Sequence, residues 1–325
     1  MYAHDDEKEL RNRDRVSKKT VLITGASGSL GERILRTLHS FSDQFEIVSI
    51  GRSAPRESHI VRHVPADLGD QRLFRDAIRT VGPIDVVLHF GAVVHTRSAT
   101  AHYIQQVNVT STSVLLDHLA AHSKRSGKRP LFVFASTIGV YGAQFSNLVT
   151  PLDETVAPKP ETDYAESKYI SEFKIQNSAN QFGIRHIILR IAPSIAASDR
   201  GNLNHLRRFA QHWHILPVAS PEKVWKSFVW AEDVAHSVTK CLSNEDLESG
   251  IYNLACERVS VAEIMHWMQR SGLTFFRVPV GESIMRGVAP QMTESTVVTA
   301  AKAERAFGID FTAFGEAYTK EWGSN

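Results

Sequence analysis

The feature that most constrains the fold is an alternation of short apolar segments with longer amphipathic ones, which begins at Thr20. The short segments are near-continuous apolar runs, the pattern of strands buried on both faces of a parallel sheet. Between them, apolar residues recur at helical spacing, as in Ile34, Leu35 and Leu38. This order predicts βαβ units in an α/β fold with a doubly wound parallel sheet. We expect strands at 20–24, 45–50, 85–90, 131–136, 186–191 and 249–255.

Composition excludes several classes of function. Lys and Arg number 37 against 35 Asp and Glu, so no overall field would recruit nucleic acid or an anionic membrane. No apolar run is long enough to span a bilayer. The two cysteines form no metal-type cluster, and such sparse use suits a reducing cytoplasm, where we expect the protein to reside. The histidines at 205, 212 and 214 lack partners with ligand spacing, so we predict no metal site.

Three glycines follow the first predicted strand and open the first predicted helix. In this position one glycine makes the tight turn, one lets the backbone approach a pyrophosphate, and one allows close helix packing. The helix N-terminus then offers free N–H groups to the phosphates. The spacing is G-x-x-G-x-x-G rather than G-x-G-x-x-G, and a glycine-rich turn without a ligand is the alternative. We predict dinucleotide binding by Gly25, Ser27, Gly28, Leu30 and Gly31.

A tyrosine and a lysine stand four residues apart in "YAESK", at Tyr164 and Lys168. At that spacing the two side chains are neighbours on one helical face. A nearby ammonium favours the phenolate, so we expect Lys168 to lower the pKa of Tyr164 from its usual value of about 10. The pair would then serve proton transfer. A chance pair on an ordinary surface helix is the alternative, and other segments must decide.

These motifs occur together with several others in an order that resembles one family. The opening "TGASGSLG" resembles the extended short-chain dehydrogenase/reductase family, which includes nucleotide-sugar epimerases, dehydratases and ketoreductases. The likeness runs from about residue 19 to 270 and implies a Rossmann-type fold. The further matching segments are "ADLGD" with Asp67 and Leu68, "HFGAVVH" with Gly91 and Ala92, "QVNVTST" with Asn108, "FASTIGVYG" with Thr137, and the later "LRIAPS", "FVWAEDVA" and "GIYNLA".

The resemblance implies a role for each matching residue. Tyr164 would be the general acid or base, and Lys168 would bind the nicotinamide ribose and stabilise the phenolate. Thr137 would donate a hydrogen bond to the reacting oxygen, unless it merely caps a strand. Asn108 would hold a relay water, unless it is an exposed helix residue. Asp67 and Leu68 would meet the adenine, with Gly91 and Ala92 in a small-residue turn, and we interpret His95 as a plain loop histidine.

Departures from the family pattern bear on the substrate. Ile138 and Gly139 stand where dehydratases carry Asp-Glu, so dehydration is not expected. Pro193 replaces an asparagine, and Lys226 an arginine, that meet the diphosphate of a nucleotide sugar in the family. A lysine can still meet phosphate as a point charge. A nucleotide-activated sugar is the predicted substrate, with Ser136, Pro193 and Lys226 contacting it; small carbonyl compounds and sterol-like or phenolic ketones stay open.

The end of the second predicted strand bears on the cofactor. It carries Gly51, Arg52 and Ser53 and no carboxylate to hold the adenosine ribose of NAD. A guanidinium binds a 2′-phosphate through paired charge-assisted bonds, so we predict NADP, held by Arg52. NAD is the alternative, with Arg52 a solvated loop residue. NADP favours a nucleotide-sugar ketoreductase; NAD favours an epimerase that retains its cofactor. A non-catalytic dinucleotide-binding module is the competing class.

The chain is predicted to contain two domains. After residue 191 the strand–helix rhythm breaks and prolines become frequent, which favours a smaller, irregular C-terminal substrate domain. The family resemblance also implies a homodimer. The predicted parts are a charged flexible tail (1–18), an NAD(P)-binding Rossmann domain (19–190, with 225–255 returning to it), and a substrate-binding domain (191–224 and 256–325).

Overall fold

The structure is a computed structural model. It describes residues 18–57, 59–94, 99–147, 150–199, 201–289 and 292–323. The predicted tail, apart from Lys18, and His95 lie outside these residues.

A seven-stranded parallel sheet forms the centre of the molecule, in the order β11-β6-β5-β4-β1-β2-β3. The order reverses between β1 and β4, which makes the sheet doubly wound and confirms the predicted fold class. All six predicted strands belong to it. The bounds are β1 (Lys19–Thr24), β2 (Phe45–Gly51), β3 (Val61–Pro65), β4 (Val86–His89), β5 (Leu131–Thr137), β6 (Arg185–Ile191) and β11 (Gly250–Leu254).

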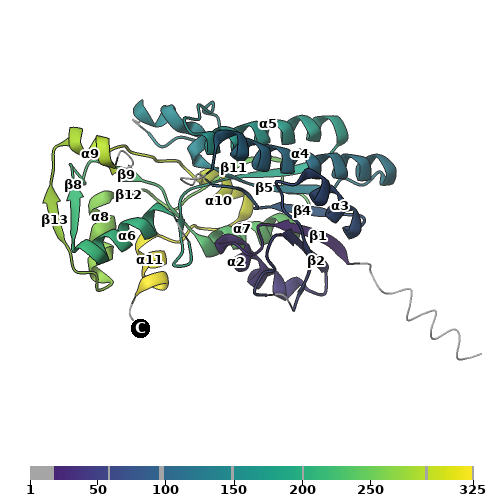
Figure 1. The fold of residues 1–325 in the computed structure, drawn as a ribbon, viewed down its shortest axis with the longest axis horizontal. Helices are drawn as coiled ribbons and strands as arrows, with labels where there is room; N and C mark the ends of the chain where they lie inside the picture. Colours follow the sequence, from purple (N-terminus) through teal and green to yellow (C-terminus); the bar gives the residue numbers. More distant parts are fainter. Residues whose placement is uncertain are drawn as a thin grey trace, which may run out of the picture.

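Helices cover both faces of the sheet (Figure 1). One face packs against α2 (Ser29–Leu38), α7 (Ala231–Ser243) and α10 (Ala301–Phe307); the other packs against α3 (Gln71–Val81), α4 (Ala101–Ser126) and α5 (Asp163–Phe182). Successive residues of β1 lie in the hydrophobic cores on opposite faces of the sheet. Val21 and Ile23 lie in the core with α2, whereas Leu22 lies in the core with α3. Burial on both faces explains why these strands are continuous apolar runs.

The edge strand β3 was not predicted. Among its residues only Val61 is buried, and Arg62 pairs across the surface with Glu46 of β2 at 3.6 Å. An edge strand needs apolar residues at few positions and often carries charged ones. The sequence of β3 therefore contains no continuous apolar run from which the strand could be predicted.

A second lobe at one end of the molecule has its own core, which includes Leu216, Met265 and Phe314 (Figure 1). Its strands pair two by two in short sheets, which explains the loss of the strand–helix alternation in the sequence.

No helix in the described part of the chain is long and apolar enough to cross a membrane. The remaining elements are η1 (His39–Phe41), η2 (Ile138–Asn147), β7 (Ser194–Ile195), α6 (Asn202–Trp213), β8 (Ile215–Val218), β9 (Trp225–Lys226), β10 (Val229–Trp230), β12 (Val259–Ser260), α8 (Val261–Arg270), β13 (Phe276–Pro279), α9 (Glu282–Val288) and α11 (Phe314–Trp322).

Candidate active site

The predicted cofactor residues follow the carboxyl ends of the strands. Gly25 follows β1, Arg52 follows β2, Asp67 follows β3 and Gly91 follows β4, while Thr137 is the last residue of β5. Parallel strands end at one edge of a sheet, so the fold brings these residues to the same edge. Ligands of open α/β sheets bind at this edge, where the strand order reverses. Here that point lies between Gly25 and Gly91.

The glycine turn is too tight for other residues. Gly25 has φ +75°, and a Cβ added there would lie 2.6 Å from the Gly91 nitrogen. A Cβ on Gly31 would lie 2.2 Å from the Gly25 oxygen. Gly28 differs, because its Cβ would meet only the Gly25 oxygen, at 3.2 Å. Gly28 is the N-cap of α2, has no side-chain cap, and is exposed together with Ser27, while Leu30 is half-buried. The turn therefore leaves space and N–H groups for a pyrophosphate.

A buried histidine, which sequence reasoning missed, joins the two central turns. Thr24 Oγ1 accepts a hydrogen bond from Gly91 N at 3.1 Å and lies 2.6 Å from His89 Nδ1. The other ring nitrogen, Nε2, lies 3.1 Å from Thr112 Oγ1 of α4. Burial, with a smaller effect of Lys168, lowers the pKa of His89 to about 3, so the ring is neutral. The sequence signal is a lone histidine at the end of an apolar strand.

Asn108 lies buried on α4 and braces the loop that follows β4. Its Oδ1 accepts a hydrogen bond from Val93 N at 2.8 Å. Its Nδ2 donates to Val93 O at 3.0 Å and to Ser167 Oγ of α5 at 2.9 Å. The alternative of an exposed helix residue is therefore wrong. The role in holding a relay water stays a prediction.

The predicted catalytic residues meet where α5 packs on the end of β5. Lys168 Nζ lies 5.8 Å from the centroid of the Tyr164 ring and donates to Ala135 O of β5 at 2.7 Å. Thr137 is half-buried, and its Oγ1 accepts from Gly139 N at 3.1 Å. A Cβ on Gly139 would lie 3.3 Å from Thr137 Oγ1 and 3.7 Å from Cβ of Ala165, the residue after Tyr164. The structure thus brings Thr137 close to the start of α5.

Burial shifts the acid–base properties of this pair. Desolvation, with a further effect of the Asp199 carboxylate, raises the pKa of Tyr164 to about 12. Desolvation lowers the pKa of Lys168 to about 7. The expectation of a lowered pKa for Tyr164 is therefore wrong for this structure, because desolvation of the phenol dominates and the Asp199 carboxylate acts in the same direction. At neutral pH Tyr164 is a protonated phenol and can act as a proton donor.

Of the residues predicted to lie on the adenine side, Leu68 is the one that lies against Gly91. The Asp67 carboxylate accepts a hydrogen bond from Gly69 N at 2.9 Å, and Asp67 lines a hollow of about 570 Å³ with Tyr103. A Cβ on Gly91 would lie 2.8 Å from a Leu68 methyl group, so these two residues are in close contact. Ala92, the next residue, is half-buried, and Arg52 is exposed.

Two of the three residues predicted to contact the substrate, Ser136 and Lys226, donate side-chain hydrogen bonds to other groups of the protein. Ser136 Oγ is buried and donates to Glu172 Oε1 at 2.5 Å. Lys226 is buried and its ammonium donates to the Glu294 carbonyl; desolvation lowers its pKa to about 8. Pro193 is exposed, and its carbonyl accepts from Val229 N at 3.1 Å. Their contact with a substrate stays a prediction.

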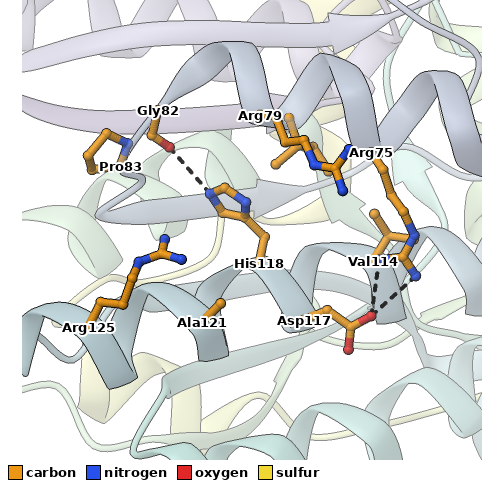
Figure 2. Close-up of a pocket in the computed structure, with 10 residues that line it drawn as sticks. Arg75, Arg79, Gly82, Pro83, Val114, Asp117, His118, Ala121 and Arg125 are labelled. Atoms are coloured by element: carbon orange, nitrogen blue, oxygen red, sulfur yellow. Dashed lines mark hydrogen bonds and ion pairs between the residues drawn. The ribbon is translucent and has the colours of Figure 1, made fainter.

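A separate hollow of about 430 Å³ lies between α3 and α4 (Figure 2). Arg75 is paired there with Asp117 at 3.3 Å, and His118 Nε2 lies 3.3 Å from the Gly82 carbonyl. Gly82 precedes β4, so this hollow lies toward the amino ends of the strands. It is therefore distinct from the candidate active site.

The fold and the site define a dinucleotide-dependent enzyme of the Rossmann type with a tyrosine–lysine pair. The sequence profile of the NAD dependent epimerase/dehydratase family matches residues 21–255, and the chain belongs to that family. The predicted family and the prediction of an NAD(P)-dependent enzyme are thereby confirmed.

Named relatives act on different substrates. The chain is 25% identical over 225 residues to a uronate dehydrogenase of Pseudomonas syringae pv. tomato, covering 69% of this chain and 74% of the relative. It is 25% identical over 283 residues to sterol demethylase protein B of Methylococcus capsulatus, covering 83% and 80%.

Solved structures confirm the fold. The Thermus thermophilus UDP-glucose 4-epimerase in complex with NAD has a TM-score of 0.75 at 22% identity, covering 93% of this chain and 97% of that one. The Bacillus cereus UDP-glucuronic acid 4-epimerase, in complex with UDP-glucuronic acid and NAD, has a TM-score of 0.74 at 17% identity, covering 94% and 98%.

Proposed function

We propose that the protein is an NADP-dependent ketoreductase that acts on a nucleotide-activated sugar. The observation that carries the reductive direction is the end of β2, where Gly51, the exposed Arg52 and Ser53 offer no carboxylate to the ribose of NAD. Tyr164, whose ring centroid lies 5.8 Å from Lys168 Nζ, would be the proton donor. A group that holds its proton at neutral pH suits protonation of an alkoxide better than removal of a hydroxyl proton.

The cofactor supplies hydride when it is bound, and the protein manages the proton. Gly28 and the N-terminus of α2 would hold the pyrophosphate, and Lys168 would bind the nicotinamide ribose. Thr137 would donate a hydrogen bond to the carbonyl oxygen and so orient it. Tyr164 would donate its hydroxyl proton to that oxygen as negative charge develops there. Lys168 would then stabilise the resulting phenolate until it is reprotonated.

The proposed substrate class is supported by relatives and limited by the site. Several similar solved structures bind UDP-sugars, for instance UDP-glucuronic acid in the Bacillus cereus enzyme. In this chain Pro193 offers no side-chain donor to a diphosphate, and the Lys226 ammonium is engaged by the Glu294 carbonyl. The ammonium has two further N–H donors, so Lys226 could bind a diphosphate only with these, without the paired bonds that an arginine offers. A free sugar acid is the second candidate, favoured by the uronate dehydrogenase relative.

An NAD-dependent epimerase is the alternative activity on the same site. It would need Tyr164 to remove a proton as well as deliver one, and a cofactor that stays bound between the two steps. A homodimer and a cytoplasmic location stay predictions.

Substrate screening tests the proposal. Purified protein is mixed with UDP-4-ketosugars and NADPH or NADH, and separately with UDP-hexoses or free uronates and NADP⁺ or NAD⁺, and both cofactor absorbance and sugar products are followed. We expect NADPH oxidation with a ketosugar and a reduced sugar as product. Interconversion of UDP-hexoses without net cofactor change would instead identify an epimerase, and cofactor reduction by a free uronate would identify a dehydrogenase of sugar acids.

A further inference from the structure

A buried carboxylate with three hydrogen bonds lies one helical turn beyond Lys168. Glu172 is fully buried on α5. Its Oε1 accepts from Ser136 Oγ at 2.5 Å and from Arg190 Nε at 3.1 Å, and its Oε2 accepts from Arg190 Nη2 at 2.7 Å. Arg190 belongs to β6 and Ser136 to β5, so this single carboxylate joins two strands to the helix.

The fork of bonds from Arg190 fixes the position of Glu172. Two parallel N–H···O bonds orient a carboxylate more strictly than one. The guanidinium is itself held, because it lies 4.8 Å from the centroid of the buried Tyr141 ring. The Tyr141 hydroxyl lies 2.9 Å from Asn253 Oδ1 of β11. The carboxylate therefore has little freedom to turn away from its helical neighbour.

Lys168 and Arg190 are two buried cations, and Glu172 is the anion next to both. Residues four apart on a helix are neighbours, so Glu172 lies one turn from Lys168. Lys168 Nζ has the Ala135 carbonyl at 2.7 Å and the Phe134 ring centroid at 4.5 Å, which are weak substitutes for water around a full charge. Within the described ranges no carboxylate pairs with Lys168 directly. Burial alone favours its neutral form.

The other titratable groups around Lys168 do not compensate it. His89 of β4 is neutral, since its pKa is about 3, and Tyr164 keeps its proton at neutral pH. Arg190 is cationic and cannot favour a second cation. Tyr141 of η2 has a raised pKa and is neutral as well. The Glu172 carboxylate is the charge that opposes the desolvation of Lys168.

We propose that Glu172 is a positioning residue which, held by Arg190 and Ser136, favours the protonated form of Lys168 and so its bond to the Ala135 carbonyl of β5. This inference rests on the proposed function only for its effect on turnover. The Ser136 bond also fixes the residue before Thr137, so one network positions both the ammonium and the hydroxyl of the candidate site.

Titration of Lys168 in the protein without added ligands tests the inference. The side-chain nitrogen of Lys168 is followed by NMR in protein labelled at lysine ε-nitrogen, with Lys168→Met for assignment. Glu172→Gln keeps the shape and removes the charge. We expect the pKa of Lys168 to fall by about one unit, the lower end of the effect of a nearby opposite charge. The matched control is Glu166→Gln, an exposed carboxylate on the same helix, with no shift expected.

A second variant keeps the test valid if Glu172→Gln does not fold, because that substitution leaves the Arg190 guanidinium buried without an anionic partner. Glu172→Gln with Arg190→Met removes both charges, and we expect a smaller decrease in the same direction. Glu172→Asp should restore most of the wild-type value. An unchanged pKa of Lys168 in both charge-removing proteins would overturn the inference, whatever reaction the enzyme catalyses.

Turnover gives the independent readout. Lys168 must be protonated to act, so activity is lost as the pH rises through its pKa. In Glu172→Gln this loss should occur at a pH about one unit lower than in the wild type. A loss equal at every pH would mark a purely structural role and contradict the inference. A shifted pKa in a protein that turns over none of the screened substrates would leave the inference intact and defeat the proposed function instead.

Discussion

Lys168 and Tyr164 lie one turn apart on α5, yet the Lys168 ammonium donates to the Ala135 carbonyl, 2.7 Å away, and faces the Tyr164 ring at 5.8 Å from its centroid. Burial shifts the two groups in opposite directions, raising the pKa of Tyr164 to about 12 and lowering that of Lys168 to about 7. Near neutral pH the phenol therefore holds its proton firmly while the ammonium holds its proton weakly. This is the arrangement expected of a site that delivers a proton.

The cost of burying Lys168 predicts a gain in stability on its removal. Its pKa falls from 10.5 to about 7 on folding, and each unit corresponds to about 1.4 kcal/mol, so the limit is about 5 kcal/mol. The Ala135 bond is lost in Lys168→Met, and we expect a net gain of about 1–3 kcal/mol in the free energy of unfolding at pH 7. Urea denaturation of both proteins measures it, with the exposed Lys174→Met as control.

The sign of the pH dependence follows from the same shift. Between the folded value of about 7 and the unfolded value of 10.5 the unfolded chain binds more protons, so the stability of the wild type rises with pH in this window. Below pH 7 the cost is complete and constant. The advantage of Lys168→Met should therefore shrink from pH 7 to pH 10. An advantage that grows over this range would contradict a lowered pKa.

Substitution in the glycine turn should separate binding from folding. A side chain on Gly28 meets only the Gly25 oxygen, at 3.2 Å, so Gly28→Val should fold. It should lose dinucleotide binding, because the branched side chain fills the space above the N-terminus of α2. Calorimetric titration and thermal unfolding measure the two effects.

Gly31 provides the contrast. A Cβ there would lie 2.2 Å from the Gly25 oxygen, so Gly31→Val should lose stability as well as binding. Normal dinucleotide binding by Gly28→Val would place the cofactor elsewhere.

Arg52 should decide cofactor preference. It is exposed beyond the end of β2, where the chain offers no carboxylate to a ribose. Arg52→Ala should weaken NADPH binding by about 1.5–3 kcal/mol, as for a lost hydrogen bond to a charged group, and change NADH binding little. The exposed Arg62→Ala on β3 is the matched control. Equal losses for both cofactors, or a wild type that already prefers NADH, would favour the epimerase.

Much of the fold could be predicted because its central strands are buried on both faces. The run from Val21 to Ile23 sends side chains into two different cores, and such runs are visible in a sequence. The edge strand β3 could not be found in this way, because most of its residues need no apolar side chain. The two-residue strands of the second lobe are too short to show any period.

The candidate site was predicted in position but not in its electrostatics. The spacing of Tyr164 and Lys168 gives their shared helical face, whereas the sign of the Tyr164 shift depends on desolvation, which is a property of the packed protein. Asn108 bonds to the backbone of Val93, and Lys226 bonds to the backbone carbonyl of Glu294. Both partners are backbone atoms of other segments, so side-chain type alone could not reveal them. The buried His89 was missed for the same reason.

In the proposed reaction the Tyr164 hydroxyl supplies the proton that accompanies hydride transfer. The most direct measurement is the single-turnover rate of NADPH oxidation for the wild type, Tyr164→Phe and the control Tyr169→Phe, an exposed tyrosine on the same helix. We expect a loss of about 10²–10⁴-fold for Tyr164→Phe alone, with cofactor affinity within a few-fold of the wild type in all three proteins. A Tyr164→Phe protein that oxidises NADPH at close to the wild-type rate would contradict this expectation.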